Sequence, residues 1–383
     1  MTGGAGSGPA AIGAAGAAGS GASVAASSGA PDAAGSGASG APGGGAPGAA
    51  GSSASSAASS GAGGSSAGSG PAAGSGATNP GQCGNAQPNL TPFGCKFAWG
   101  TNDPGGALSA FAGLSFVSKW VGYELDKAGN LPRCDGCSWL SQQVQSTSLV
   151  PVYYAYFIGF FGKANGLPDG NENPTGPNLT TDAAKLIRTQ RAGLLNAYGS
   201  YAKQTAAVWR DKPLVWLLEG DFVQYTADTQ KEKLSYTELG ELARDITCAI
   251  KSQMPNAVVA INHSTWNSDQ VTNDFWAAMK SSSYDLVWTT GVANNQGFME
   301  QGADATKYNA KTATYAYLSM LTGKKLFVDT SFGLSEMADS WSSADAATLN
   351  ARIAEGVIAA NVTKPPADYV SKVGALQLSA ICK

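Results

Sequence analysis

The chain has 383 residues, a formal net charge of −3 and 13% charged residues, with no run of basic residues. Nucleic-acid partners and anionic membranes leave a basic patch in a sequence, and a membrane span needs roughly 18 or more consecutive apolar residues. Neither pattern is present. We therefore expect no nucleic-acid partner and no membrane-spanning segment, and we expect a monomer.

From Met1 to about Thr78 the chain is almost entirely Gly, Ala, Ser and Pro, with one charged residue, Asp32, and no aromatic residue. Such a segment cannot bury enough apolar surface to offset the entropy lost on ordering, so we predict a disordered tether. Residues 79–383 carry all the tryptophans and cysteines and are long enough for one large domain.

In chain order, the domain contains eight apolar or β-branched segments that predict strands. They are Cys95–Asn102, Leu114–Leu125, Ser148–Phe160, Leu214–Asp221, Ala257–Trp266, Tyr284–Val292, Lys324–Gly333 and Val373–Cys382. Helical periodicity and capping residues predict helices over Thr181–Ala206, Ser235–Met254, Asp269–Ser281, Tyr308–Leu321 and Ala344–Asn361. This alternation predicts an α/β fold, a (β/α)8 barrel of the TIM type or a distorted relative, more than an open doubly wound sheet.

Six cysteines occur, at Cys83, Cys95, Cys134, Cys137, Cys248 and Cys382. The spacing CDGC would fit a zinc site or a redox-active pair, but no second CxxC follows and the only histidine is distant. Disulfides are therefore favoured, with Cys83–Cys95 as the expected local pair. A polar tether joined to such a domain is typical of exported proteins. These features lead us to expect a secreted or surface-tethered protein. Because Met1 is not followed by a signal-peptide pattern, we expect that the signal peptide is absent from this sequence.

Candidate catalytic residues follow from the barrel, because the active site of such barrels lies at the carboxyl ends of the strands. The stretch PLVWLLEGDF, Pro213–Phe222, ends a buried strand with Glu219 and Asp221, which alternation places on the same side. Two like charges side by side destabilise the fold unless they are solvated, paired with opposite charges or needed for function. Burial raises the pKa of such acids. Together with Asp329, which closes the segment LFVD, they are the candidate catalytic carboxylates.

Candidate substrate-binding residues lie at the same strand ends: Trp99, Glu124, Tyr154, Asn262, His263, Trp266 and Trp288. Aromatic rings stack on the apolar faces of sugars, and glycosidic cleavage uses one protonated carboxylic acid and a second carboxylate. We therefore predict a secreted glycoside hydrolase that cleaves a β-linked polysaccharide and uses no cofactor or metal. A non-catalytic glycan-binding barrel is the alternative.

Several polar and aromatic residues have a simpler structural interpretation. A lone histidine such as His263 is more often a hydrogen-bonded core residue than a catalyst, and Asp103 and Asp126 are expected to bind backbone N–H groups. Trp139, Trp209 and Trp341 are expected to pack in the core. The loop Leu167–Gly176 holds clustered oxygen ligands, but its spacing matches no EF-hand, so a mobile lid is favoured over calcium binding.

The segments LVWLLEGD, AVVAINHSTW, ANNQGFMEQGADATKYN and YAYLSMLTGKKLFVDTSFG together resemble the family-6 glycoside hydrolases, secreted cellulases with a distorted β/α barrel. In that family the catalytic acid is the Asp of a Glu-Pro-Asp strand end, which the resemblance places on Asp221, behind Glu219. The resemblance also matches His263 and Trp266 to a Gly-His-x-x-Trp-like turn of that family, and Asp329 to the Asp of an Asp-Thr-Ser strand end. It implies a cellulose-like substrate. Gly220 stands where that family has Pro.

A second barrel superfamily, the retaining glycosidases with an acid/base on strand four and a nucleophile on strand seven, would use Glu219 and Asp329. That superfamily normally has Asn before the first acid and Glu at the second position. This chain has Leu218 and Asp329 there. The sequence leaves inverting and retaining mechanisms both open.

Overall fold

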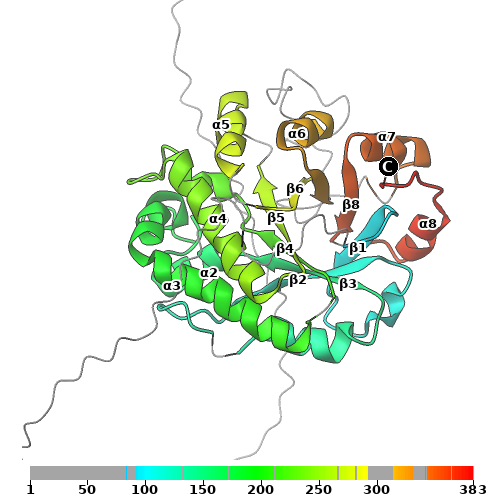
Figure 1. Ribbon diagram of the computed structural model, residues 1–383, viewed down its shortest axis with the longest axis horizontal. Coiled ribbons are helices and arrows are strands. Elements are labelled where there is room, and N and C mark those ends of the chain that lie inside the picture. Colours follow the sequence, from blue (N-terminus) through cyan, green and yellow to red (C-terminus); the bar gives the residue numbers. More distant parts are fainter. Residues whose placement is uncertain are drawn as a thin grey trace, which may run out of the picture.

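The computed structural model describes residue 83 and residues 92–382, except 132, 171, 211, 265–266, 281–282, 292–313, 331–340, 342 and 364. Eight parallel strands form a closed barrel in which each strand pairs with the next and β8 pairs with β1 (Figure 1). The predicted (β/α)8 architecture is thus confirmed. The strands are β1 Ala98–Asn102, β2 Phe116–Val121, β3 Val150–Ala155, β4 Leu214–Leu218, β5 Ala257–His263, β6 Leu286–Thr290, β7 Lys325–Asp329 and β8 Val357–Val362.

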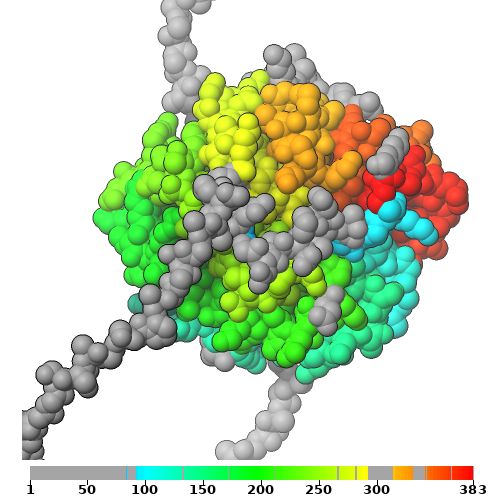
Figure 2. Space-filling view, in the orientation of Figure 1, coloured from blue at the N-terminus to red at the C-terminus, as the bar shows by residue number. Residues whose placement is uncertain are grey.

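Helices cover the outside of the barrel (Figure 1). In the space-filling view the red C-terminal part of the chain lies beside the cyan part near residue 100 (Figure 2). Ser235 and Glu238 form the predicted capping box at the start of α4. None of the helices in the described part of the chain is long and apolar enough to span a membrane. The helices are α1 Asp135–Trp139, α2 Phe157–Ala164, α3 Leu179–Val208, α4 Tyr236–Gln253, α5 Asp269–Met279, α6 Tyr315–Thr322, α7 Ala346–Ala354 and α8 Tyr369–Ala375, with short turns η1 Leu108–Phe111, η2 Leu140–Val144 and η3 Phe222–Thr226.

Two apolar layers result from the alternation of side chains along the strands. The barrel interior is filled by a cluster that includes Val152, Val215, Leu217 and Val258. Outward residues such as Trp216 pack in a larger cluster between the barrel and the helices. Toward the carboxyl ends of the strands, the interior positions change from apolar to polar or aromatic residues, and this layer forms the mouth of the barrel described below.

The last strand is Val357–Val362, so the helix predicted over Ala344–Asn361 is confirmed only over Ala346–Ala354, and the prediction of a strand over Val373–Cys382 was wrong. Helix α7 ends at Ala354, and Gly356 adopts φ +104°, a conformation that ends the helix and starts the extended segment. The β-branched residues that follow favour a strand. Helix α8 occupies part of the segment predicted as the eighth strand.

Disulfides were correctly predicted, but their pairing was not. The six cysteines pair as Cys83–Cys248, Cys95–Cys382 and Cys134–Cys137. The expected local pair Cys83–Cys95 does not form, because Cys83 lies against α4 and Cys95 against the C-terminal segment. Spacing along the chain cannot report such long-range proximity.

The Cys95–Cys382 disulfide holds the C-terminal segment against the amino end of the barrel. The N–H of Ile381 donates to the carbonyl of Cys95 at 3.0 Å, and Ile381 packs against the interior cluster together with Phe93. The ring of Phe93 lies 5.1 Å from that of Phe116, the first residue of β2. Phe93 and Ile381 therefore close the amino end of the barrel.

Removing this disulfide with Cys95→Ala and Cys382→Ala is expected to lower the free energy of unfolding by about 2–5 kcal/mol, since the bond closes a very long loop. Its cysteines are 287 residues apart, against three for Cys134–Cys137. Urea unfolding of this variant beside Cys134→Ser with Cys137→Ser checks the prediction. Equal losses in the two variants would contradict it.

Candidate active site at the carboxyl end of the barrel

Asp329 is the carboxylate that closes β7, and its side chain lies in the barrel mouth with 4% of the residue exposed. The hydroxyl of Tyr154, from β3, donates a short hydrogen bond to Asp329 Oδ2. Burial and the charge of Asp329 hold the pKa of the Tyr154 phenol well above its usual range, so this phenol keeps its proton. Thr363 Oγ1 lies 3.5 Å from the second carboxylate oxygen.

A polar layer from three more strands supports this pair. Asn361 Nδ2, from β8, donates to Tyr154 Oη at 3.0 Å and to Asn102 Oδ1 at 2.8 Å. Ser118 Oγ, from β2, lies 2.7 Å from Asn102 Oδ1 and 3.1 Å from Asn361 Oδ1. Each of these groups is fixed by at least two others, so Tyr154 and Asp329 are held in one orientation.

An aromatic surface adjoins Asp329. The rings of Trp120 and Tyr154 are stacked, with centroids 5.1 Å apart and an angle of 13° between their planes. Trp288 meets Tyr154 edge-on at 5.8 Å, and its Nε1 donates to the carbonyl of Leu218 at 2.8 Å. Of the three rings only that of Trp120 is partly exposed at the mouth, and Tyr154 and Trp288 pack behind it.

Asp221 reaches the mouth through an unusual turn after β4. The strand ends at Leu218, and both Glu219 (φ 36°) and Asp221 (φ 56°) adopt left-handed conformations before η3 begins. A non-glycine residue pays about 1–2 kcal/mol for this conformation, and such residues gather at functional sites. The N–H of Asp221 donates to Asn262 Oδ1 at 3.0 Å, and Ser264 Oγ lies 3.2 Å from Asp221 Oδ1.

Burial raises the pKa of Asp221 to about 7, and the negative charge of Asp169 contributes to the rise. Asp169, which follows α2, accepts a hydrogen bond of 2.9 Å from the Tyr156 hydroxyl. Burial also raises the pKa of Asp169. The Tyr156 ring in turn lies edge-on to Trp120. A series of contacts thus leads from Asp169, the charged neighbour of Asp221, through Tyr156, Trp120 and Tyr154 to Asp329.

Glu219 lies behind the mouth, not beside Asp221. Its Oε1 accepts the N–H of Ile158 at 2.9 Å and a short hydrogen bond from the Tyr198 hydroxyl, and only 1% of the residue is exposed. Burial raises the pKa of Glu219 to about 8. The expected alternation that placed both acids on one side ends at Leu218, because the left-handed turn rotates the two side chains apart.

The other candidate residues occupy different surroundings. Asn262 lies in the mouth beneath Asp221, as described above. Trp99 faces outward and meets Tyr369 of α8 edge-on, at 6.1 Å. His263 also faces outward, where its Nδ1 accepts from Trp276 Nε1 at 3.2 Å, and burial lowers its pKa to about 3. Glu124 forms a surface ion pair with Arg133 at 2.7 Å. Trp266 lies outside the described residues.

The residues expected to have only structural roles do have such contacts. Asp126 accepts the N–H groups of Ala128 and Asn130, as expected, and Asp103 accepts the N–H of Gly105 and pairs with Lys119. Trp139, Trp209 and Trp341 are buried in the core as expected. Within the described part of the chain no group of three or more His, Cys, Asp or Glu could hold a metal ion.

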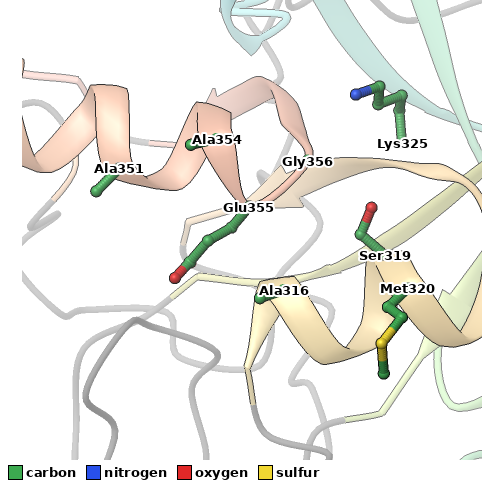
Figure 3. A pocket seen from close by; sticks show the side chains of 8 residues that line it. All are labelled: Ala316, Ser319, Met320, Lys325, Ala351, Ala354, Glu355 and Gly356. Carbon is green, nitrogen blue, oxygen red and sulfur yellow. The ribbon is translucent and has the colours of Figure 1, made fainter.

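An open groove of about 430 Å³ lies elsewhere, between α6 and α7 (Figure 3). It is lined by Ser319 and Met320 on one side and by Ala351 and Ala354 on the other. Lys325, at its edge, is the first residue of β7. The groove therefore lies toward the amino end of the strands, away from Asp221 and Asp329.

No protein-family profile and no curated protein matches this chain. Similar solved structures include a modular endo-β-1,4-mannanase from Cellulomonas fimi of glycoside hydrolase family 26, with 12% identity, a TM-score of 0.47, and 73% of this chain and 70% of that chain covered. A family-26 β-mannanase from Bacteroides ovatus has 10% identity and a TM-score of 0.45 over 73% of this chain and 88% of that one. A family-10 endoxylanase from a sugarcane soil metagenome has 10% identity and a TM-score of 0.43 over 74% and 91%.

These three neighbours are glycoside hydrolases of families 26 and 10, so they give no specific support to the resemblance to family 6. At 10–12% identity and with TM-scores below 0.5, they assign neither a family nor an activity to this chain.

Proposed function

We propose that this protein is a glycoside hydrolase in which Asp221 is the general acid and Asp329 is the second carboxylate. The observation that carries the proposal is that Asp221 and Asp329 both lie at the carboxyl end of the barrel, where Asp329 contacts Tyr154 and Asp221 lies near Asp169, whose partner Tyr156 meets Trp120 edge-on. The surroundings of the two acids differ, because Asp221 has a pKa of about 7 while Asp329 accepts from a phenol that keeps its proton. Such a difference separates an acid from a nucleophile or base.

In the proposed reaction, protonated Asp221 gives its proton to the glycosidic oxygen as the bond from that oxygen to the anomeric carbon breaks. The carboxylate of Asp329 either attacks the anomeric carbon or takes a proton from the attacking water. In the first case water later releases the sugar from Asp329, and Asp221 regains its proton from that water. Ser264 and Asn262 hold Asp221 in place for this transfer.

For the substrate we propose a β-linked polysaccharide, with β-glucans of the cellulose type included. The partly exposed ring of Trp120, which is stacked on the buried Tyr154, offers an apolar face of the kind on which sugar rings pack. We also propose that the protein is secreted or held at a cell surface. Three disulfides and the absence of free cysteines among the described residues support an oxidising compartment.

The experiment that tests this function is release of reducing sugar from cellulose, mixed-linkage β-glucan, mannan, xylan and β-1,3-glucan. The wild type is compared with the double variant Asp221→Asn, Asp329→Asn and with the control Asp103→Asn, whose carboxylate lies in an ion pair with Lys119 outside the mouth. We expect release from at least one polymer, lost only in the double variant. Binding without release, unchanged in the double variant, would instead indicate a glycan-binding barrel.

The aromatic surface gives a separate prediction for binding. Trp120→Ala is expected to raise KM about 2–10-fold, since stacking on an aromatic ring is worth about 0.5–1.5 kcal/mol, while kcat changes less. Trp99→Phe is the matched control, because Trp99 packs against Tyr369 outside the barrel. Steady-state kinetics on the polymer found in the panel measure both. An unchanged KM for Trp120→Ala would place the sugar elsewhere.

A further inference from the structure

Glu219 carries a buried carboxyl group that the proposed reaction does not use. Its Oε1 receives two donors, the N–H of Ile158 in the first turn of α2 and the hydroxyl of Tyr198 in α3. Its Oε2 is buried and has no hydrogen-bond partner within the described ranges. Because both donors belong to the helices outside the barrel, the side chain of Glu219 points away from the mouth and out of reach of a substrate there.

The two ends of this contact each lead to a group at the mouth. Along the chain from Glu219, Asp221 is two residues away, across the left-handed turn. Along α2 from Ile158, Tyr156 is two residues away and is the residue that precedes the helix. Tyr156 contacts Asp169 through its hydroxyl and Trp120 through its ring. One carboxylate thus ties the turn that carries Asp221 to the helix that follows Tyr156.

We propose that Glu219 is a positioning residue, which holds the left-handed turn after β4 against α2 and α3 so that Asp221 faces the mouth beside Tyr156 and Asp169. This inference rests on the proposed function of Asp221. The physical reason is that two non-glycine residues in left-handed conformations need contacts that hold them there. The oxygen Oε1 of the carboxyl group supplies two such contacts at one atom, and the backbone N–H of Glu219 adds a third, to Ala155 O at 3.3 Å.

Because only the acceptor is needed, glutamine should replace Glu219. In Glu219→Gln the amide oxygen can accept from both Ile158 and Tyr198, so we expect kcat within about threefold of wild type. In Glu219→Leu both donors lose their acceptor, and we expect kcat to fall about 10–100-fold with KM little changed, since a small displacement of a reacting group has effects of this size. Tyr198→Phe removes one of the two donors, and we expect its kcat to lie between those of Glu219→Gln and Glu219→Leu.

The test combines these kinetics with a titration that does not depend on activity. Carboxyl ¹³C NMR of Asp221 is expected to give a pKa near 7 in wild type and in Glu219→Gln. In Glu219→Leu we expect this pKa to move toward the ordinary value, as the turn opens to water. This readout remains valid if the chain cleaves no polysaccharide, so failure of the proposed function and failure of the positioning role are distinguished.

Two results would overturn the positioning role. A loss of activity in Glu219→Gln as large as in Asp221→Asn would show that the ionisable carboxyl itself is required. An unchanged kcat and an unchanged Asp221 titration in Glu219→Leu would show that the contact does not position Asp221. If Glu219→Leu does not fold, Tyr198→Phe answers the same question, and wild-type values of both readouts in that variant would also count against the role.

Discussion

Replacing Asp329 with asparagine is expected to lower kcat by about 10³-fold or more, because the amide can neither attack the anomeric carbon nor take a proton from water. The fold should persist, since the amide oxygen of the new side chain can still accept from the Tyr154 hydroxyl, the contact that Asp329 makes through Oδ2. The measurement is kcat and KM on the polymer identified in the substrate panel. KM and the urea midpoint are expected to stay close to those of wild type.

The control for this result is Asp103→Asn, which removes a carboxylate from the end of β1 without touching the mouth. Asp103 pairs with Lys119 and accepts the N–H of Gly105. Its variant should keep wild-type turnover. Retention of more than a tenth of wild-type kcat by Asp329→Asn would remove Asp329 from the reaction, and the anomeric form of the first product, observed by NMR, separates the nucleophile from the base.

The fold could largely be predicted because seven strands leave apolar segments bounded by turns. The eighth strand could not be recognised in this way, because the segment GVIAANV follows α7 almost directly. Its apolar residues continue the apolar pattern of that helix. The predicted helix was therefore extended to Asn361, across most of this strand, and the eighth strand was placed in the C-terminal segment. That segment does reach the barrel, but as a plug at the amino end that contributes Ile381. Chain position alone could not tell the two arrangements apart.

The candidate site was predicted from the residues that close each strand, and this rule has a clear limit. Asp329, Tyr154 and Asn262 follow the alternation of regular strands, and the structure places all three in the mouth. Glu219 and His263 do not lie there, the first because of the left-handed turn and the second because its position in β5 faces α5.

The residues that the rule missed lie one to three positions inside the carboxyl ends of the strands. Trp120 and Ser118 share the interior side of β2 with Phe116, and this period of two was the available signal. Asn361 was missed for a different reason, since it lay in a segment predicted as helix. Its buried amide joins β1, β3 and β8.

Replacing Asp221 with asparagine is expected to lower kcat on a polysaccharide by about 10²–10⁴-fold, the range of general-acid catalysis. A sugar alkoxide is a poor leaving group and needs the proton. The fold should be kept, because the substituted side chain can still accept from Ser264 and the backbone N–H at this position can still donate to Asn262. The loss should be much smaller on an aryl glycoside with a strongly acidic phenol, which leaves without protonation. Equal losses on the two substrates would assign Asp221 another role.

The pH profile gives the same assignment independently. Burial, with help from Asp169, raises the pKa of Asp221 to about 7, and only the protonated form can act as the acid. Wild-type kcat/KM on the polysaccharide is therefore expected to be high below pH 7 and to fall as the pH rises through it. Asp169→Asn removes the neighbouring negative charge and should move this fall to lower pH. In Asp221→Asn the residual kcat/KM should no longer decrease as the pH rises through 7. If that decrease persists in the variant, the ionisation belongs to a different group.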